Sequence, residues 1–97
     1  MAAYILFIRE SEVRDPAEMA LYRGGHRPAL VENFGMKALA AYGAMETLEG
    51  APADGLVILS FPDVETARAW YYSPEYQEAA IHRQKAADYR GFLIEGL

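Results

Sequence analysis

Two side chains in this sequence have the chemistry of an active site, and helical spacing turns both toward the interior. His26 lies four residues after Tyr22 and four before Leu30, so its imidazole is predicted to face the core. An imidazole titrates near neutral pH and can take a proton from an enol or a phenol. His26 is therefore a candidate catalytic base, although a partly buried histidine bonded to a backbone carbonyl would leave the same pattern.

Arg83 is the second candidate, because it follows Tyr76 and Ala80 at helical spacing and shares their apolar face. A buried guanidinium needs a polar or anionic partner. That partner could be the carboxylate or enolate of a ligand, which the planar arginine fork fits. The alternative, which the small size of the chain favours, is an internal partner such as Asp88, Glu95 or a carbonyl, through which Arg83 would hold the last strand to the helix.

Aromatic rings crowd the same stretch, AWYYSPEYQEAAIHRQKAA, around a Ser-Pro step. Trp70 and Tyr76, together with Tyr22, could form the walls of a pocket for a flat substrate. Rings beside a helix break are more often the core of a small domain, with hydroxyls that reach solvent or backbone. Tyr72 is predicted to be exposed because it precedes the residue that caps the next helix.

Several classes of function find no support in the residues. The chain has no cysteine, and His26 and His82 lack ligand spacing with each other or with a carboxylate, so no metal is predicted. The glycines at 24 and 25 lack the lysine and the Ser/Thr of a phosphate loop, and no cofactor is predicted. The net charge is −5 and the nine Lys and Arg are scattered, which argues against nucleic acid as a partner.

The helices are predicted from their start signals. Asp15-Pro16 gives an N-cap followed by the proline that fits the first helical position, and apolar residues then recur at helical spacing to Phe34, with a break expected at 24–28. Asp63 caps a second helix, and Ser73-Pro74 restarts it as a third. The crowded stretch is thus predicted to be two short helices in tandem.

The strands are predicted from apolar runs bounded by charges or turn residues: Ala3–Arg9, residues 36–49 with a bulge at Gly43, residues 56–61, and Tyr89–Glu95. The order strand, helix, strand, strand, helix, strand is that of the ferredoxin-like α+β fold. We therefore expect one domain over residues 1–97, with an antiparallel sheet and both helical segments on one of its faces.

The composition of the strands predicts a homodimer. In AYILFIR and LVILSF, both the odd-numbered and the even-numbered positions carry apolar residues. Because helices can cover only one face of the sheet, each strand would leave a row of large apolar side chains in water. The simplest cover is the same face of a second copy, with two-fold symmetry. The first apolar run is too short for a signal peptide or a bilayer span, and a soluble, cytoplasmic protein with no membrane contact is expected.

The segment FPDVETARAWYYSPEYQEAAIHRQKAAD resembles the bacterial family catalogued as domain of unknown function 1330. The Phe-Pro end of a strand, the Ser-Pro-Glu-Tyr-Gln helix start and the following Arg83 carry the resemblance, which extends to Leu48-Glu49-Gly50 and the closing Glu95-Gly96. The resemblance implies a dimeric α+β barrel, a superfamily that includes cofactor-independent monooxygenases, lactone isomerases and haem-dependent enzymes. Fold kinship of this kind does not assign a reaction.

Two hypotheses for the function follow. In the first, a pocket between helices and sheet binds a small anionic or enolisable metabolite, with His26 as proton acceptor, Arg83 as counter-ion, and Tyr22, Trp70 and Tyr76 as walls, as in a cofactor-free oxygenase or isomerase. In the second, the chain is a non-catalytic homodimer that binds a small molecule or serves a neighbouring protein. Whether the chain is an enzyme is left open by the sequence.

Overall fold

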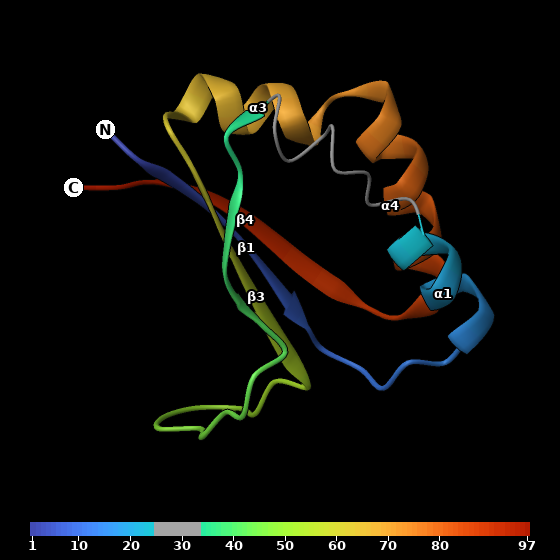
Figure 1. The fold of residues 1–97 in the computed structure, drawn as a ribbon. Helices are drawn as coiled ribbons and strands as arrows, with labels where there is room; N and C mark the ends of the chain where they lie inside the picture. The colour runs from blue at the N-terminus through green and yellow to red at the C-terminus, as the bar shows by residue number, and fades with distance from the viewer. Residues whose placement is uncertain (25–33) are drawn as a thin grey trace.

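The computed structural model describes residues 1–24 and 34–97 and confirms the ferredoxin-like α+β fold. The elements run β1 (Ala3–Arg9), α1 (Pro16–Gly24), β2 (Lys37–Ala41), β3 (Gly55–Phe61), α3 (Val64–Tyr71), α4 (Pro74–Ala86) and β4 (Tyr89–Glu95). The strands form one sheet in the order β2-β3-β1-β4, and every neighbouring pair is antiparallel. Helices α3 and α4 lie on one face of this sheet, and α1 packs against α4 (Figure 1).

The register of β1 separates the two faces of the sheet. Its odd residues, Ala3, Ile5 and Phe7, are buried toward the helices and pair with Phe61, Leu59 and Val57 of β3. Its even residues pair with the even residues of β3 and β4, and this second face carries no helix of the described chain. A strand with a side-chain period of two therefore presents one row to the core and the other to the open face.

The helix starts in the second half of the chain are as predicted. The Asp63 carboxylate accepts a hydrogen bond from the Thr66 N–H at 2.6 Å at the start of α3. Ser73 Oγ accepts from the Tyr76 N–H at 3.3 Å and donates to the Trp70 carbonyl at 2.7 Å, so one hydroxyl ends α3 and caps α4. Such side-chain caps satisfy backbone groups that the first and last turns leave unpaired.

The aromatic residues of the tandem helices form the centre of the core. Trp70 and Tyr76 are each 1% exposed, and their ring centroids lie 4.0 Å apart. The Phe61 ring lies 5.4 Å from the Trp70 ring on the sheet side. The helix break thus brings two large rings from successive helices against each other, and this contact fixes the packing of α3 and α4 on β1 and β3.

Two of the predicted boundaries differ from the structure. The strand predicted over residues 36–49 ends at Ala41, and its bulge lies between Ala38 and Ala40 instead of at Gly43. Tyr42 adopts a positive φ of 57°, which turns the backbone out of the extended conformation. The helix predicted to reach Phe34 is described only as α1, and the break expected at 24–28 falls mostly outside the described residues.

Candidate functional site

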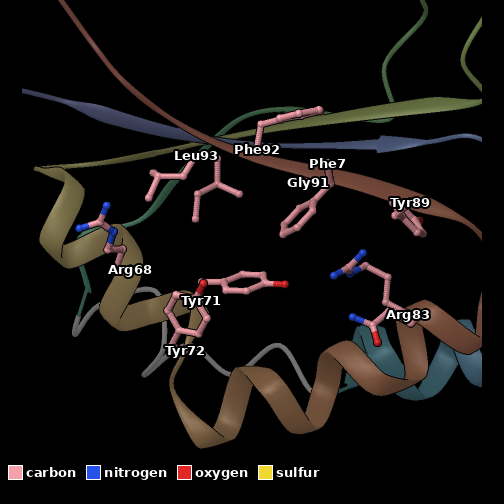
Figure 2. A pocket seen from close by; sticks show the side chains of 11 residues that line it. Phe7, Arg68, Tyr71, Tyr72, Arg83, Tyr89, Gly91, Phe92 and Leu93 are labelled. Atoms are coloured by element: carbon pink, nitrogen blue, oxygen red, sulfur yellow. The ribbon is translucent and has the colours of Figure 1, made fainter.

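A cavity of about 330 Å³ lies between the tandem helices and the helix-facing side of β1 and β4. This volume is at the small end of the ~300–1,000 Å³ typical of small-molecule sites. Figure 2 shows Phe7 and Leu93 reaching into it from the sheet and Tyr71 and Arg83 from the helices, whereas the Phe92 ring points to the other side of the sheet. Its lining comprises Ile5, Phe7, Arg68, Tyr71, Tyr72, Arg83, Gln84, Tyr89, Gly91, Phe92 and Leu93.

Arg83 provides the buried charge of this cavity. The residue is 4% exposed, and its guanidinium points into the cavity from α4 (Figure 2). The guanidinium carbon lies 4.4 Å from the centroid of the Phe7 ring and 4.9 Å from that of Tyr89, so the cation rests on two aromatic faces. The Arg83 side chain also hydrogen-bonds Tyr76, but its Nε has no hydrogen-bond partner in the described chain.

The internal partners considered for Arg83 do not pair with it in the described chain. Asp88 accepts instead from Arg14 Nη1 at 2.9 Å, and Glu95 forms no ion pair within residues 1–24 and 34–97. The buried Nε of Arg83 has no hydrogen-bond partner there either. A buried cation with an unused donor is costly to the folded chain, which is the arrangement expected where an anionic ligand supplies the missing partner.

Two pairs of tyrosine hydroxyls lie around the same guanidinium. The Tyr22 and Tyr76 hydroxyls are 3.2 Å apart, and the Tyr42 and Tyr89 hydroxyls are 2.6 Å apart. Burial raises the pKa of Tyr22, Tyr42 and Tyr76 above the ordinary value, and the nearby positive charge of Arg83 opposes this rise without cancelling it. These phenols therefore stay protonated at physiological pH and act as hydrogen-bond donors, not as bases.

The raised pKa values predict that the protein loses stability in alkali. Above about pH 10 the unfolded chain releases phenolic protons that folded Tyr22 and Tyr76 retain, so the unfolded state binds fewer protons. The stability that depends on these phenols is complete below that pH and is lost as the pH rises. Urea unfolding at pH 8 to 11 checks this, and Tyr22→Phe should flatten the decline. Unfolding that is independent of pH over this range would contradict it.

The structure separates the predicted wall residues from the cavity. Trp70 and Tyr76 are in the core and do not line this cavity. Tyr22 does not line it either, but its hydroxyl contacts that of Tyr76, and its ring centroid lies 5.9 Å from the guanidinium carbon of Arg83. Tyr72 is exposed, as predicted, yet it lies on the cavity lining. The candidate base His26 lies outside the described residues.

Three lining residues were not selected as candidates from the sequence, namely Tyr89 on β4 and Arg68 and Tyr71 on α3. Tyr89 and Tyr71 supply rings to the cavity, and Arg68 supplies a second cation. Alternation along β4 could have indicated Tyr89, because it shares its parity with Gly91 and Leu93, which face the helices. No sequence signal distinguishes Arg68 from other arginines on helix surfaces.

Within residues 1–24 and 34–97, His, Asp and Glu side chains form no group of three that could hold a metal ion. No helix among the described residues is long and apolar enough to cross a bilayer.

The fold and cavity define a small ferredoxin-like α+β protein with a pocket between its helices and sheet. The chain belongs to the family described as Domain of unknown function (DUF1330), whose model matches residues 2–97. No curated protein matches the sequence.

Solved structures share this fold at low identity. A protein of unknown function from Rhodopseudomonas palustris is similar at a TM-score of 0.71 and 23% identity, over 99% of this chain and 82% of that one. A dimeric ferredoxin-like protein of unknown function from Thermobifida fusca is similar at a TM-score of 0.59 and 15% identity, over 98% of this chain and 90% of that one. Hydroxynitrile lyase from Passiflora edulis is similar at a TM-score of 0.56 and 16% identity, over 99% of this chain and 93% of that one.

Proposed function

We propose that this protein binds a small organic anion in the cavity, with the carboxylate or enolate oxygen of the ligand on Arg83. The observation that carries the proposal is the buried guanidinium whose Nε lacks a partner within the described chain. An anion there would convert an unpaired buried donor into a charge-assisted hydrogen bond. The rings of Phe7, Tyr71 and Tyr89 would pack against a flat apolar part of the ligand.

The second candidate function is catalysis at the same site. A guanidinium beside protonated phenols stabilises negative charge on an oxygen, so it favours the enolate of an enolisable ligand over the neutral form. Under this proposal His26 takes the proton and no cofactor takes part, as in a monooxygenase- or isomerase-like reaction. The alternative is that the cavity binds its ligand without converting it. The likeness to hydroxynitrile lyase concerns the fold, and it favours neither a catalytic role nor simple ligand binding.

We also propose that the protein is a homodimer formed by its open sheet face. The large apolar residues of this face on β1, β3 and β4 are Tyr4, Leu6, Ile8, Leu56, Ile58, Phe92 and Ile94. In the single chain Phe92 is 46% and Ile94 57% exposed, which is unusual for a contiguous apolar surface in water. A second copy would cover this face by sheet-on-sheet packing at ~10 Å. The dimeric neighbour from Thermobifida fusca has the same fold.

Native mass spectrometry of gently purified protein tests the anion site. We expect a dimer that carries a reproducible extra mass, which Arg83→Gln removes and Lys85→Gln retains. Lys85→Gln is the matched control, because it also removes one positive charge from α4. Lys85 is exposed and does not line the cavity.

The stability of the same variant separates a ligand site from an internal tie. Arg83→Gln removes the ring contacts with Phe7 and Tyr89 but no ion pair of the described chain, so it should lower the free energy of unfolding of the ligand-free protein by at most ~2 kcal/mol. A loss of ~3 kcal/mol or more would mean that Arg83 completes a buried pair within the protein, and the proposed anion site would then be wrong.

A further inference from the structure

The cavity holds a second arginine, Arg68, in the last turn of α3. We propose that the ligand is an elongated dianion with a flat apolar middle, one anionic group on Arg83 and the other on Arg68. This inference rests on the proposed function of the Arg83 site and names the chemical class of its ligand.

The two arginines lie at opposite ends of the cavity. Figure 2 shows Arg68 on α3 at one end of the lining and Arg83 on α4 at the other, with Tyr71 between them and with Phe7 and Leu93 reaching down from the sheet. The wall between the charges is therefore aromatic and aliphatic. A ligand that spans the cavity meets a cation, an apolar section and a second cation in that order.

The charge of the lining supports a dianion over a monoanion. The whole chain has fourteen Asp and Glu against nine Lys and Arg, yet the lining contains two arginines and no acidic residue. No ion pair of the described residues includes Arg68. The two arginines line one small cavity that contains no carboxylate, so together they create a positive potential there. A doubly charged anion neutralises both cations, whereas a singly charged anion leaves one of them unpaired.

The two ends differ in burial, which assigns each a different role. Arg83 is 4% exposed and away from solvent, so its bond to an anion is strong and little affected by salt. Arg68 is exposed, so its contribution is smaller and is screened by salt. The inner end supplies most of the affinity, and the outer end discriminates dianions from monoanions of the same shape.

Terephthalate and its monomethyl ester are the probes, because they share a flat ring and differ by one negative charge. We expect isothermal titration calorimetry at low salt to give about three- to fivefold tighter binding of terephthalate, as exposed ion pairs allow. This preference should shrink toward unity in high salt, while binding of the monoester changes little.

Arg68→Gln should abolish the preference by weakening terephthalate about three- to fivefold and leaving the monoester unchanged. Lys85→Gln is the matched control and should keep the wild-type ratio, because it changes the overall charge equally without touching the cavity. Arg83→Gln should weaken both probes at least about tenfold.

The outcomes distinguish this inference from the proposed function. Equal binding of both probes to the wild type, with both lost in Arg83→Gln, would overturn the dianion and retain the anion site. A preference for terephthalate that persists in Arg68→Gln would overturn the role of Arg68. Absence of binding of either probe to the wild type at millimolar concentration would overturn both proposals.

Discussion

Ile58→Asp is expected to convert the proposed dimer to a monomer. Ile58 lies in the middle of the open sheet face, in register with Leu6 on β1 and Ala40 on β2. In a sheet-on-sheet dimer its side chain would be buried between two apolar layers, and a carboxylate there would lose its water without a partner. Two-fold symmetry places the change twice in the same interface, which doubles the penalty.

Light scattering coupled to size exclusion at ~10 µM protein measures the change. The wild type should give twice the 10.8 kDa chain mass and Ile58→Asp the single chain mass. Ile81→Asp is the control, because Ile81 is 51% exposed on α4 and lies away from the sheet. A wild-type monomer at this concentration would disprove the dimer. If Ile58→Asp stays dimeric, the dimer interface is not the open sheet face.

Trp70→Ala is expected to lower the free energy of unfolding by ~3–5 kcal/mol, as large truncations in a packed core do. The Trp70 side chain is almost fully buried, between the Tyr76 ring and the Phe61 ring. Its removal leaves a void at the junction of α3 and α4. Since domains of this size have ~5–15 kcal/mol of stability, the variant should be close to unfolding at 37 °C.

Trp70→Phe keeps the result measurable if the alanine variant does not fold. It should cost less, because an aromatic ring remains and because the buried indole N–H, which has no hydrogen-bond partner in the described chain, is removed. Tyr72→Ala is the control for stability, with an expected change within ~0.5 kcal/mol, since Tyr72 is 70% exposed. Urea unfolding that shows equal losses for Trp70→Ala and Tyr72→Ala would contradict the assignment of Trp70 to the core.

The starts of α3 and α4 were predictable because caps act locally. Asp63 and Ser73-Pro74 satisfy or remove backbone donors within one turn, so their effect does not depend on the rest of the fold. The strands β1 and β3 were predictable for a related reason, since a short apolar run of aliphatic and aromatic residues is typical of a strand that packs on a core. The order of these elements then leaves few ways to form an antiparallel sheet.

The end of β2 was not predictable, because the extent of an edge strand depends on its partner. Residues 42–49 have neither clear alternation nor a strong turn signal, and β3 offers pairing positions only as far as Gly55. The positive φ of Tyr42 is stabilised by tertiary contacts, including the hydroxyl contact with Tyr89 and the Arg9 guanidinium 5.4 Å from its ring centroid. Such contacts join residues that are far apart in sequence.

By itself, the sequence determined the ferredoxin-like fold and the inward position of Arg83, because helical spacing and capping are local properties. Only the tertiary structure decided which rings surround that cation. The rotation of α3 and α4 on the sheet directs Trp70 and Tyr76 into the core and leaves Tyr71 on the cavity. The register of β4 on β1 brings Tyr89 beneath the guanidinium, since strand pairing sets positions that no local pattern encodes.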